Sequence, residues 1–260
     1  MAFVNLLIEN LGAVRRITVN RPDKLNALNA ATLDELTRAF EDAGTDGSVR
    51  AVILRGAGEK AFVAGADISE LATVTPVQAR DFARRGQRTM RTVETLGKPV
   101  IAQISGYALG GGMELALACH LRIASEKARL GQPEVNLGVL PGFGGTQRLL
   151  RVTGRGATLE LCLTGVQIDA ARAYQLNLVN RVVAPEALES ETLALAEQLA
   201  ASAPEALRGV LDAVILGGEA DLVTGLDYEA QAFATSASTE DMREGTRAFL
   251  ERRKPAFTGR

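Results

Sequence analysis

An apolar, glycine-rich stretch, residues 105–146, constrains the fold of this chain more than any other part. It begins near a run of three glycines, residues 110–112, that opens an apolar helical pattern. The free backbone N–H groups at such a helix start attract an anion or a developing oxyanion. Two carboxylates, Glu114 and Glu134, follow among uncharged neighbours, where a carboxyl is able to hold a proton near neutral pH. The stretch therefore has the outline of an active site.

The composition indicates a globular protein rather than a membrane-bound or nucleic-acid-binding one. Of the 260 residues, 47% are hydrophobic and 23% are charged, and the formal net charge is −2. A chain of this length forms one large domain or two small ones. Without a basic field we expect no nucleic-acid partner. No apolar run approaches the roughly 20 residues that a membrane-spanning helix requires, so no membrane partner is expected either.

The cysteine and histidine content excludes several kinds of site. Cys119 and Cys162 have neither metal-binding nor CxxC spacing, and with no secretory signal at the start we expect a reduced, cytoplasmic location. The single histidine, His120, excludes Ser-His-Asp and Cys-His mechanisms unless it serves itself, and it excludes a site with several histidine ligands. We therefore expect no metal. His120 lies at a predicted helix end, where a cap or a structural group is the expected role.

Short apolar strands alternate with helical patterns through the first 184 residues, which favours an α/β fold. These strands are too apolar to leave one face in water, and they cover residues 14–19, 49–55, 100–104, 121–124 and 178–183. The first helix is predicted at Thr32–Ala43, with Thr32 as the N-cap and Glu35 at the capping-box spacing. Because the patterns after residue 184 are helical, we divide the chain into a core, residues 1–184, and a helical C-terminal region, residues 185–260.

Groups of residues spread along nearly the whole chain resemble the motifs of the enoyl-CoA hydratase (crotonase) family. Each group is weak alone, but together and in this order they are specific. They are Arg21-Pro22 with Asn26-Ala27-Leu28, residues 60–68 (KAFVAGADI), residues 98–102 (KPVIA), residues 106–115 (GYALGGGMEL), residues 131–134 (GQPE) and residues 140–149 (LPGFGGTQRL). The resemblance implies an α/β core of repeated β-β-α turns wound as a spiral. It also implies that the helical region forms homotrimers, which often pair into hexamers.

By resemblance, the activity is the reversible syn hydration of a trans-2-enoyl-CoA to a 3-hydroxyacyl-CoA. The N–H groups of Ala66 and Gly111 are then expected to bind the thioester oxygen, on which an enolate charge develops. Glu114 is expected to act as the base toward water and Glu134 as the acid toward Cα, with the roles reversed in dehydration. Retention of both glutamates favours a hydratase over relatives that keep one acid or none.

The resemblance also implies where the coenzyme A part of the substrate lies, and no separate cofactor is expected. Coenzyme A is placed along residues 21–28 and 64–69. Phe249 and Arg252 match C-terminal positions that reach the coenzyme of a neighbouring subunit, although a helix with one apolar and one basic face is an alternative explanation for them. The predicted substrate contacts are Lys24, Ala27, Leu28, Ala64, Ala66, Asp67, Ile68, Ser69, Gly111, Phe249 and Arg252.

Two other functions are compatible with the same motifs. An enoyl-CoA isomerase needs proton transfer but no water at Cβ, and the two glutamates count against it. An RNA-binding relative of the hydratases needs a basic face, and five arginines do lie in residues 80–91. The net charge and the lack of nearby aromatic residues for base stacking count against RNA binding. The length and branching of the acyl chain do not follow from the sequence.

Overall fold

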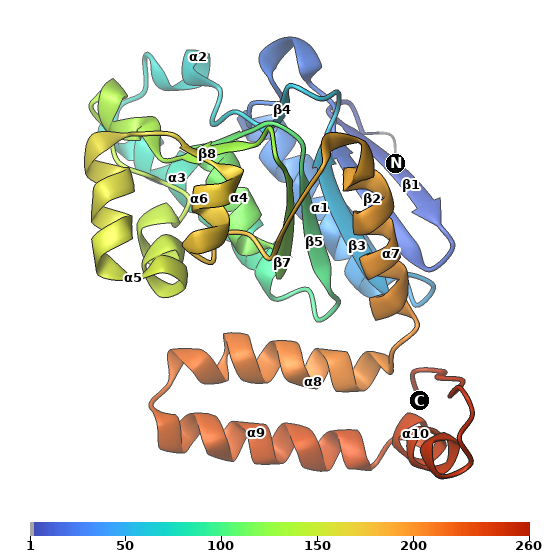
Figure 1. The fold of residues 1–260 in the computed structure, drawn as a ribbon. Helices are drawn as coiled ribbons and strands as arrows, with labels where there is room; N and C mark the ends of the chain where they lie inside the picture. Colours follow the sequence, from blue (N-terminus) through green and yellow to red (C-terminus); the bar gives the residue numbers. More distant parts are fainter. Residues whose placement is uncertain (1–2) are drawn as a thin grey trace.

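A mostly parallel sheet forms the centre of the molecule within residues 3–260, which the computed structural model describes (Figure 1). Only β1 runs antiparallel to its neighbour, and the other neighbouring strands are parallel. Such sheets are buried on both faces, which explains why the predicted strands lack polar alternation. Its strands lie in the order β1 (Leu6–Leu11), β2 (Val14–Val19), β3 (Ala51–Gly56), β5 (Val100–Ile104), β7 (Leu121–Ser125) and β10 (Arg181–Val183).

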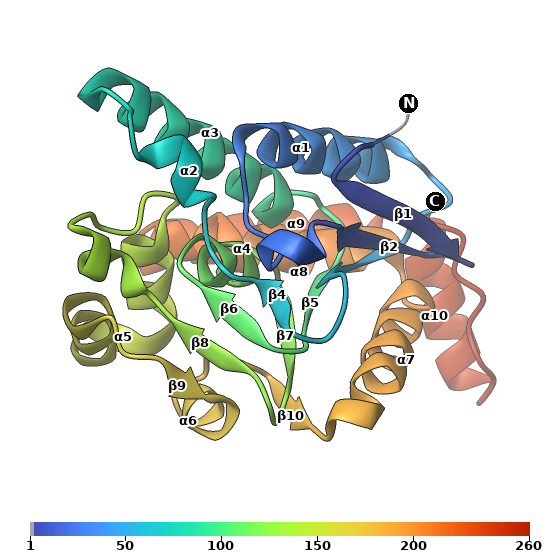
Figure 2. The same ribbon diagram turned by 90° about the horizontal axis from the view of Figure 1, so that it is seen from above.

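A second, smaller sheet contains β4 (Ala61–Val63), β6 (Tyr107–Leu109), β8 (Arg129–Gly131) and β9 (Ile168–Asp169) (Figure 2). The chain crosses from the large sheet to the small one at β3–β4, β5–β6 and β7–β8, and a helix follows each crossing. Gly106 allows the second crossing, because a Cβ there would lie 2.2 Å from the carbonyl oxygen of Lys60. The repeated β-β-α turn confirms the predicted α/β class and the spiral core.

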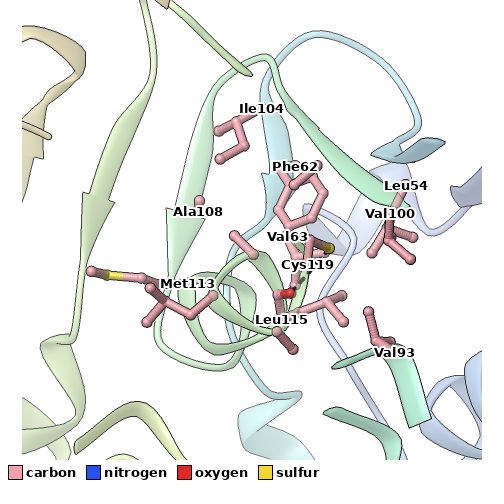
Figure 3. Packing of buried hydrophobic residues seen from close by; sticks show 14 of the residues in the cluster. Leu54, Phe62, Val63, Val93, Val100, Ile104, Ala108, Met113, Leu115 and Cys119 are labelled. Atoms are coloured by element: carbon pink, nitrogen blue, oxygen red, sulfur yellow. Dashed lines mark hydrogen bonds between the residues drawn. The ribbon is translucent and has the colours of Figure 1, made fainter. Parts of the chain in front are cut away.

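The helices of the core pack on both faces of the large sheet. Figure 3 shows side chains of α4 among those of β4 and β5, and every residue of α4 is buried. On the opposite face, α7 (Leu188–Ala200) packs its buried residues against β2, β3, β5 and β7. The core helices before α7 are α1 (Ala30–Thr45), α2 (Ile68–Leu71), α3 (Pro76–Glu94), α4 (Gly111–Ala118), α5 (Gly145–Thr164) and α6 (Ala170–Gln175).

The start of α1 differs from the prediction. The N-cap is Asn29, whose Oδ1 accepts from the Thr32 N–H at 2.8 Å. Thr32 is buried inside the helix, and Glu35 accepts from the N–H groups of Val4 and Asn5 instead of closing a capping box. Asparagine and threonine are both good N-caps, so the local pattern allowed either start. The pairing of Glu35 with the N-terminal segment is a tertiary contact that the pattern does not contain.

The last three helices stand apart from the core. Figure 1 shows α8 (Pro204–Ile215) and α9 (Leu222–Ala237) as two rods side by side below the sheets, with α10 (Glu240–Leu250) beside their end. No residue of α8 or α9 is buried. Although α7 follows residue 184, it packs on the sheet, so the part of the chain that leaves the core begins at α8. Among the described helices, none combines the length and the hydropathy needed to cross a bilayer.

Candidate active site

A cavity of about 630 Å³ opens at the N-terminal end of α4. Side chains of α3 bound it on one side, and the start of η2 (Pro133–Leu137) and the following loop bound it on the other. The lining is mostly apolar. Ala66, Gly111, Glu114 and Glu134 all line this cavity, so the fold brings together the four residues that the sequence singled out for chemistry.

Glu114 lies in the first turn of α4 and is almost fully buried. Its Oε1 accepts from the backbone N–H of Phe143 at 2.7 Å and from that of Gly145 at 2.6 Å. Burial raises the pKa of Glu114 to about 8, and the nearby charge of Glu134 acts in the same direction, against the two backbone hydrogen bonds. Glu114 is therefore both held in place and able to carry a proton near neutral pH.

Glu134 lies in the first turn of η2 and faces the glycine run. A Cβ added to Gly110 would lie 3.0 Å from Oε1 of Glu134, so the carboxyl rests against the backbone there. The buried amide of Gln132, with its nitrogen turned toward Glu134, donates to Oε1 at 2.9 Å and to Oε2 at 3.1 Å. Burial raises the pKa of Glu134 to about 7.

The two carboxyls act as a pair, because the charge of Glu134 contributes to the raised pKa of Glu114. Interacting groups release their protons in two steps that belong to the pair. Burial raises both pKa values toward neutral pH, so the pair is able to hold a proton there. A pair in this state is able to give a proton to one atom and take a proton from another.

The two residues expected to supply backbone N–H donors, Ala66 and Gly111, line the same cavity. The N–H of Leu28 donates to Gly65 O at 2.8 Å, and the O of Leu28 accepts from the Asp67 N–H at 2.8 Å. Because successive N–H groups of an extended segment face opposite sides, the N–H of Ala66 faces away from Leu28. Gly111 is the first residue of α4, so its N–H has no partner within the helix. A Cβ on Gly111 would lie 3.4 Å from the Ala66 nitrogen, which shows how closely the two segments approach.

Asp67, one of the predicted substrate contacts, orients the loop that carries Ala66. It is the N-cap of α2, and its Oδ1 accepts from the Ser69 hydroxyl at 2.7 Å. Its Oδ2 accepts from the Arg21 guanidinium at 2.9 Å, and Arg21 also donates to Ala27 O. The hydrogen bonds from Ser69 and Arg21 lower the pKa of Asp67. Asp67 thus stays ionised and ties the 64–69 loop to the 21–28 segment.

The predicted coenzyme contacts fall into two groups. Residues 24–28 and 64–69 lie side by side, joined by the Ala64 N–H to Leu25 O bond at 3.0 Å, and Ala64, Ala66 and Ile68 reach the cavity. The side chain of Leu28 is buried, whereas that of Lys24 is exposed to solvent. Phe249 and Arg252 lie in and after α10, and neither lines the cavity of its own chain. Their proposed contact with a neighbouring subunit stays a prediction.

His120 is a structural group, as expected for a lone histidine at a helix end. Its Nδ1 accepts from the Val100 N–H at 2.9 Å, and its Nε2 lies 3.0 Å from Glu94 O. Burial lowers the pKa of His120, so the neutral ring donates from Nε2. His120 joins the end of α3 to the start of β5 and does not line the cavity.

The arginine-rich helix α3 is largely engaged in ion pairs. Arg80 pairs with Asp81, Arg85 with Asp34, and Arg91 with Glu94, at 3.1–3.4 Å. Arg84 and Arg88 are exposed and form no ion pair within the described residues, so the pairs neutralise part of the basic face that RNA binding would require.

The structure adds three residues that the sequence interpretation did not assign to the site. Gln132 contacts Glu134, Phe143 forms part of the cavity wall, and Phe82 of α3 packs against Phe143 with ring centroids 5.2 Å apart. Gln132 and Phe143 lie in the motifs at residues 131–134 and 140–149, and this position was the only sequence signal that they belong to the site. Phe82 had none, because it lies about 60 residues before its partner in a helix defined by its charges.

Comparisons with known proteins place the chain among enoyl-CoA hydratases and related enzymes. A family model described as enoyl-CoA hydratase/isomerase matches residues 9–260. The chain is 45% identical to a short-chain-enoyl-CoA hydratase of Clostridium acetobutylicum, over 98% of this chain and 97% of that protein. It is 42% identical to a crotonyl-CoA hydratase of Syntrophomonas wolfei, over 99% of each. The crystal structure of an enoyl-CoA hydratase from Bacillus anthracis superposes with a TM-score of 0.95 at 43% identity, covering 99% of this chain and 100% of that one.

Proposed function

This chain belongs to the enoyl-CoA hydratase/isomerase family, and we propose that it catalyses the reversible syn hydration of short-chain trans-2-enoyl-CoA to 3-hydroxyacyl-CoA. The observation that carries the proposal is the meeting of two carboxyls with raised pKa values and two backbone N–H groups around one apolar cavity. Coenzyme A is part of the substrate, and the reaction as proposed uses no further cofactor.

The N–H groups of Ala66 and Gly111 are proposed to bind the thioester oxygen. When water adds to Cβ of the conjugated thioester, negative charge moves to that oxygen as an enolate forms. Preorganised N–H donors stabilise this charge, and loss of one such donor typically raises the barrier by roughly 3–4 kcal/mol. The N-terminal end of α4 adds a dipole of the same sense beside Gly111.

Glu114 is proposed to take the proton of the attacking water, and Glu134 to deliver a proton to Cα. The water oxygen bonds to Cβ while its proton passes to Glu114, and dehydration reverses each transfer. The two backbone N–H groups on Oε1 of Glu114 favour its ionised form, so Oε2 is assigned to the water. Because the raised pKa values of the two carboxyls belong to the pair rather than to either residue, the proposal places the shared proton on Glu134 when the substrate is bound.

The preference for short acyl chains rests on the wall opposite the glutamates. The ring of Phe143 is almost fully buried and packs on Phe82. A Cβ added to Gly86 would lie 2.1 Å from the Phe143 ring, and one added to Gly111 would lie 3.1 Å from it. The ring thus fills the space between α3 and α4. The names of the Clostridium and Syntrophomonas relatives, short-chain and crotonyl, point in the same direction.

The test is a panel of trans-2-enoyl-CoA substrates of increasing chain length, followed by loss of the conjugated-thioester absorbance. We expect kcat/KM to be highest for crotonyl-CoA and to fall with chain length. Phe143→Ala is expected to flatten this fall, because it opens the wall, whereas Phe233→Ala on the distant α9 leaves the ratio between substrates unchanged. No hydration of any substrate would overturn the proposed activity, and equal rates at all lengths would overturn the chain-length preference. Product analysis with a 3-enoyl-CoA separates the hydratase from an isomerase.

We also propose that the protein assembles as a homotrimer or as a pair of trimers through its C-terminal helices. The support is a stripe of exposed apolar side chains on α9, formed by Leu222, Leu226 and Phe233, which recur on one helix face. Exposed apolar patches of this kind mark subunit contacts in soluble proteins. A cytoplasmic location is proposed as well, and the free thiols of Cys119 and Cys162 support it.

A further inference from the structure

The position of Glu114 depends on a short loop that is separate from its own helix. Both hydrogen bonds to Oε1 come from this loop, from the N–H groups of Phe143 and Gly145. Gly144, between them, has a φ of 107°, a region that favours glycine. A shift of the loop therefore moves the carboxylate directly. The residues that hold the loop in place therefore also determine where the Glu114 carboxylate lies.

Arg148, one turn into α5, holds this loop from outside the cavity. Its Nη1 donates to Phe143 O at 3.1 Å. A Cβ added to Gly144 would lie 2.4 Å from the same Nη1, so the guanidinium lies directly against the loop backbone. Although Arg148 does not line the cavity, its charge lowers the pKa of Glu114, against burial and the charge of Glu134, which raise it.

Arg148 is itself held by Glu94 at the end of α3. Its Nε donates to Oε1 of Glu94 at 3.1 Å and its Nη2 to Oε2 at 3.0 Å, a two-pronged pair with both side chains mostly buried. Such pairs fix geometry as well as charge. Burial opposes ionisation of Glu94, but hydrogen bonds and charge from Arg148, together with those from Arg91, outweigh it and lower the pKa. The backbone O of Glu94 is held in turn by His120.

We propose that Arg148, clamped by Glu94, is a positioning residue for hydration: it holds the Phe143–Gly145 loop so that Glu114 points at the attacking water. This inference rests on the proposed function, because it assigns Glu114 a role in that reaction. The Arg148 guanidinium joins Glu94 of α3 to the Phe143 carbonyl, and Gln87 of α3 donates to the neighbouring Gly142 O at 2.9 Å. Displacements of about 1 Å cost up to about 100-fold in rate.

The charged and titratable groups around Glu114 determine what a pH profile will report. Glu134 on η2 raises its pKa, and Arg148 on α5 lowers it. Cys162, further along α5, lies close enough to feel the charges of both glutamates, and burial raises its thiol pKa. Removal of the Arg148 charge leaves Glu134 as the main neighbouring charge. The pKa of Glu114 then moves up.

The test compares Arg148→Met, Arg148→Lys and Glu94→Gln with Arg151→Met, a matched control that removes an exposed arginine from the same helix. For Arg148→Met we expect kcat on crotonyl-CoA to fall by roughly 10-fold to 100-fold while KM changes by less than about threefold. The acidic limb of kcat/KM, which reports the free enzyme, should move to higher pH. Arg148→Lys keeps the charge, so its pH limb should stay near that of the wild type while kcat falls less. Arg151→Met should behave as the wild type.

The outcomes separate this inference from the proposed function. Wild-type kcat and an unmoved pH limb in Arg148→Met would overturn the positioning role. So would equal losses in the Met and Lys variants with unmoved pH limbs and a lowered melting temperature, because that result describes a purely structural pair. If Arg148→Met does not fold, Arg148→Lys and Glu94→Gln decide the matter by the same kcat and pH readouts. A wild-type protein without hydratase activity rejects the proposed function itself.

Discussion

The core and the α8–α9 pair treat apolar side chains in opposite ways. In α4 all eight residues are buried, the catalytic candidate Glu114 among them. In α8 and α9 no residue is buried, and Leu222 and Phe233 are 76% and 75% exposed. The helix α4 therefore has all its apolar surface covered within its own chain, whereas the α8–α9 pair leaves a stripe that a second molecule is suited to cover.

The same contrast separates the chemistry from the assembly. The cavity, both carboxyls and both N–H groups come from residues between 64 and 143 of one chain. The C-terminal region contributes none of these groups, and its proposed role is to join chains and to bring Phe249 and Arg252 to a neighbour. Substitutions around the cavity should therefore change turnover, whereas substitutions in α9 should change the oligomeric state.

The largest effect is expected from the two carboxyls. Glu114→Gln and Glu134→Gln keep the shape of the side chain but remove proton transfer, which typically contributes 10²–10⁴-fold. Each variant should lose at least about 100-fold in kcat while crotonyl-CoA still binds. Steady-state hydration and equilibrium binding measure the two parts. Glu41→Gln, at an exposed site on α1, is the control, and near-wild-type turnover in either active-site variant would contradict the assignment.

An effect of comparable size is expected from the backbone donor of the 64–69 loop and from the segment that faces it. Ala66→Pro removes the N–H itself and should raise the barrier by about 3 kcal/mol. Ala66→Val keeps the donor and should be affected less. Gly111→Val tests the facing segment, where a side chain meets the Phe143 ring and approaches the Ala66 nitrogen, and it should abolish turnover. Circular dichroism checks the fold of each variant, and equal activities of the Pro and Val forms at position 66 would argue against an oxyanion site there.

Charged substitutions in the apolar stripe of α9 should change the oligomeric mass of the protein rather than its turnover. The double substitution Leu226→Glu with Phe233→Glu places charge on the exposed apolar face, which opposes association. Light scattering at micromolar concentration should show a shift from an assembly toward the 27.5 kDa chain, with kcat changed by less than about 10-fold because the carboxyls are untouched. Gln198→Glu on the exposed face of α7 introduces the same kind of charge as a control. A wild-type protein that is already a monomer would remove the proposed assembly.

The smallest effect concerns stability and pH. The pKa of Glu114 is about 8 in the folded protein against 4.5 for an ordinary glutamate, so between these values the folded state keeps a proton that the unfolded state has lost. The contribution of Glu114 to stability is therefore full below pH 4.5 and is lost as the pH rises from there through 8. Glu114→Gln should reduce this fall, which denaturant unfolding at pH 5 and pH 8.5 measures. If the free energy of unfolding of Glu114→Gln fell as much between these pH values as that of the wild type, Glu114 would not be the cause of the fall.

The elements that are local in sequence were predictable, because hydrophobic runs and turn residues act over a few positions. All five predicted strands occur in the large sheet, and the glycine run does start a buried helix. The strands β4, β6 and β8 were not predicted, since three residues are too few to show a period. The cap of α1 was misplaced because two good capping residues lie three positions apart.

The site shows the same division between motif and contact. Glu114, Glu134, Ala66 and Gly111 stand in motifs that the sequence presents directly, and the structure places all four around one cavity. The ring pair of Phe82 with Phe143 and the clamp of Arg148 by Glu94 have no such signature. Their partners lie more than 50 positions apart, and arginines and phenylalanines of equal local appearance occur elsewhere in the chain. Which of them meet depends on how the spiral closes, because side chains distant in sequence become neighbours only through packing of the whole core.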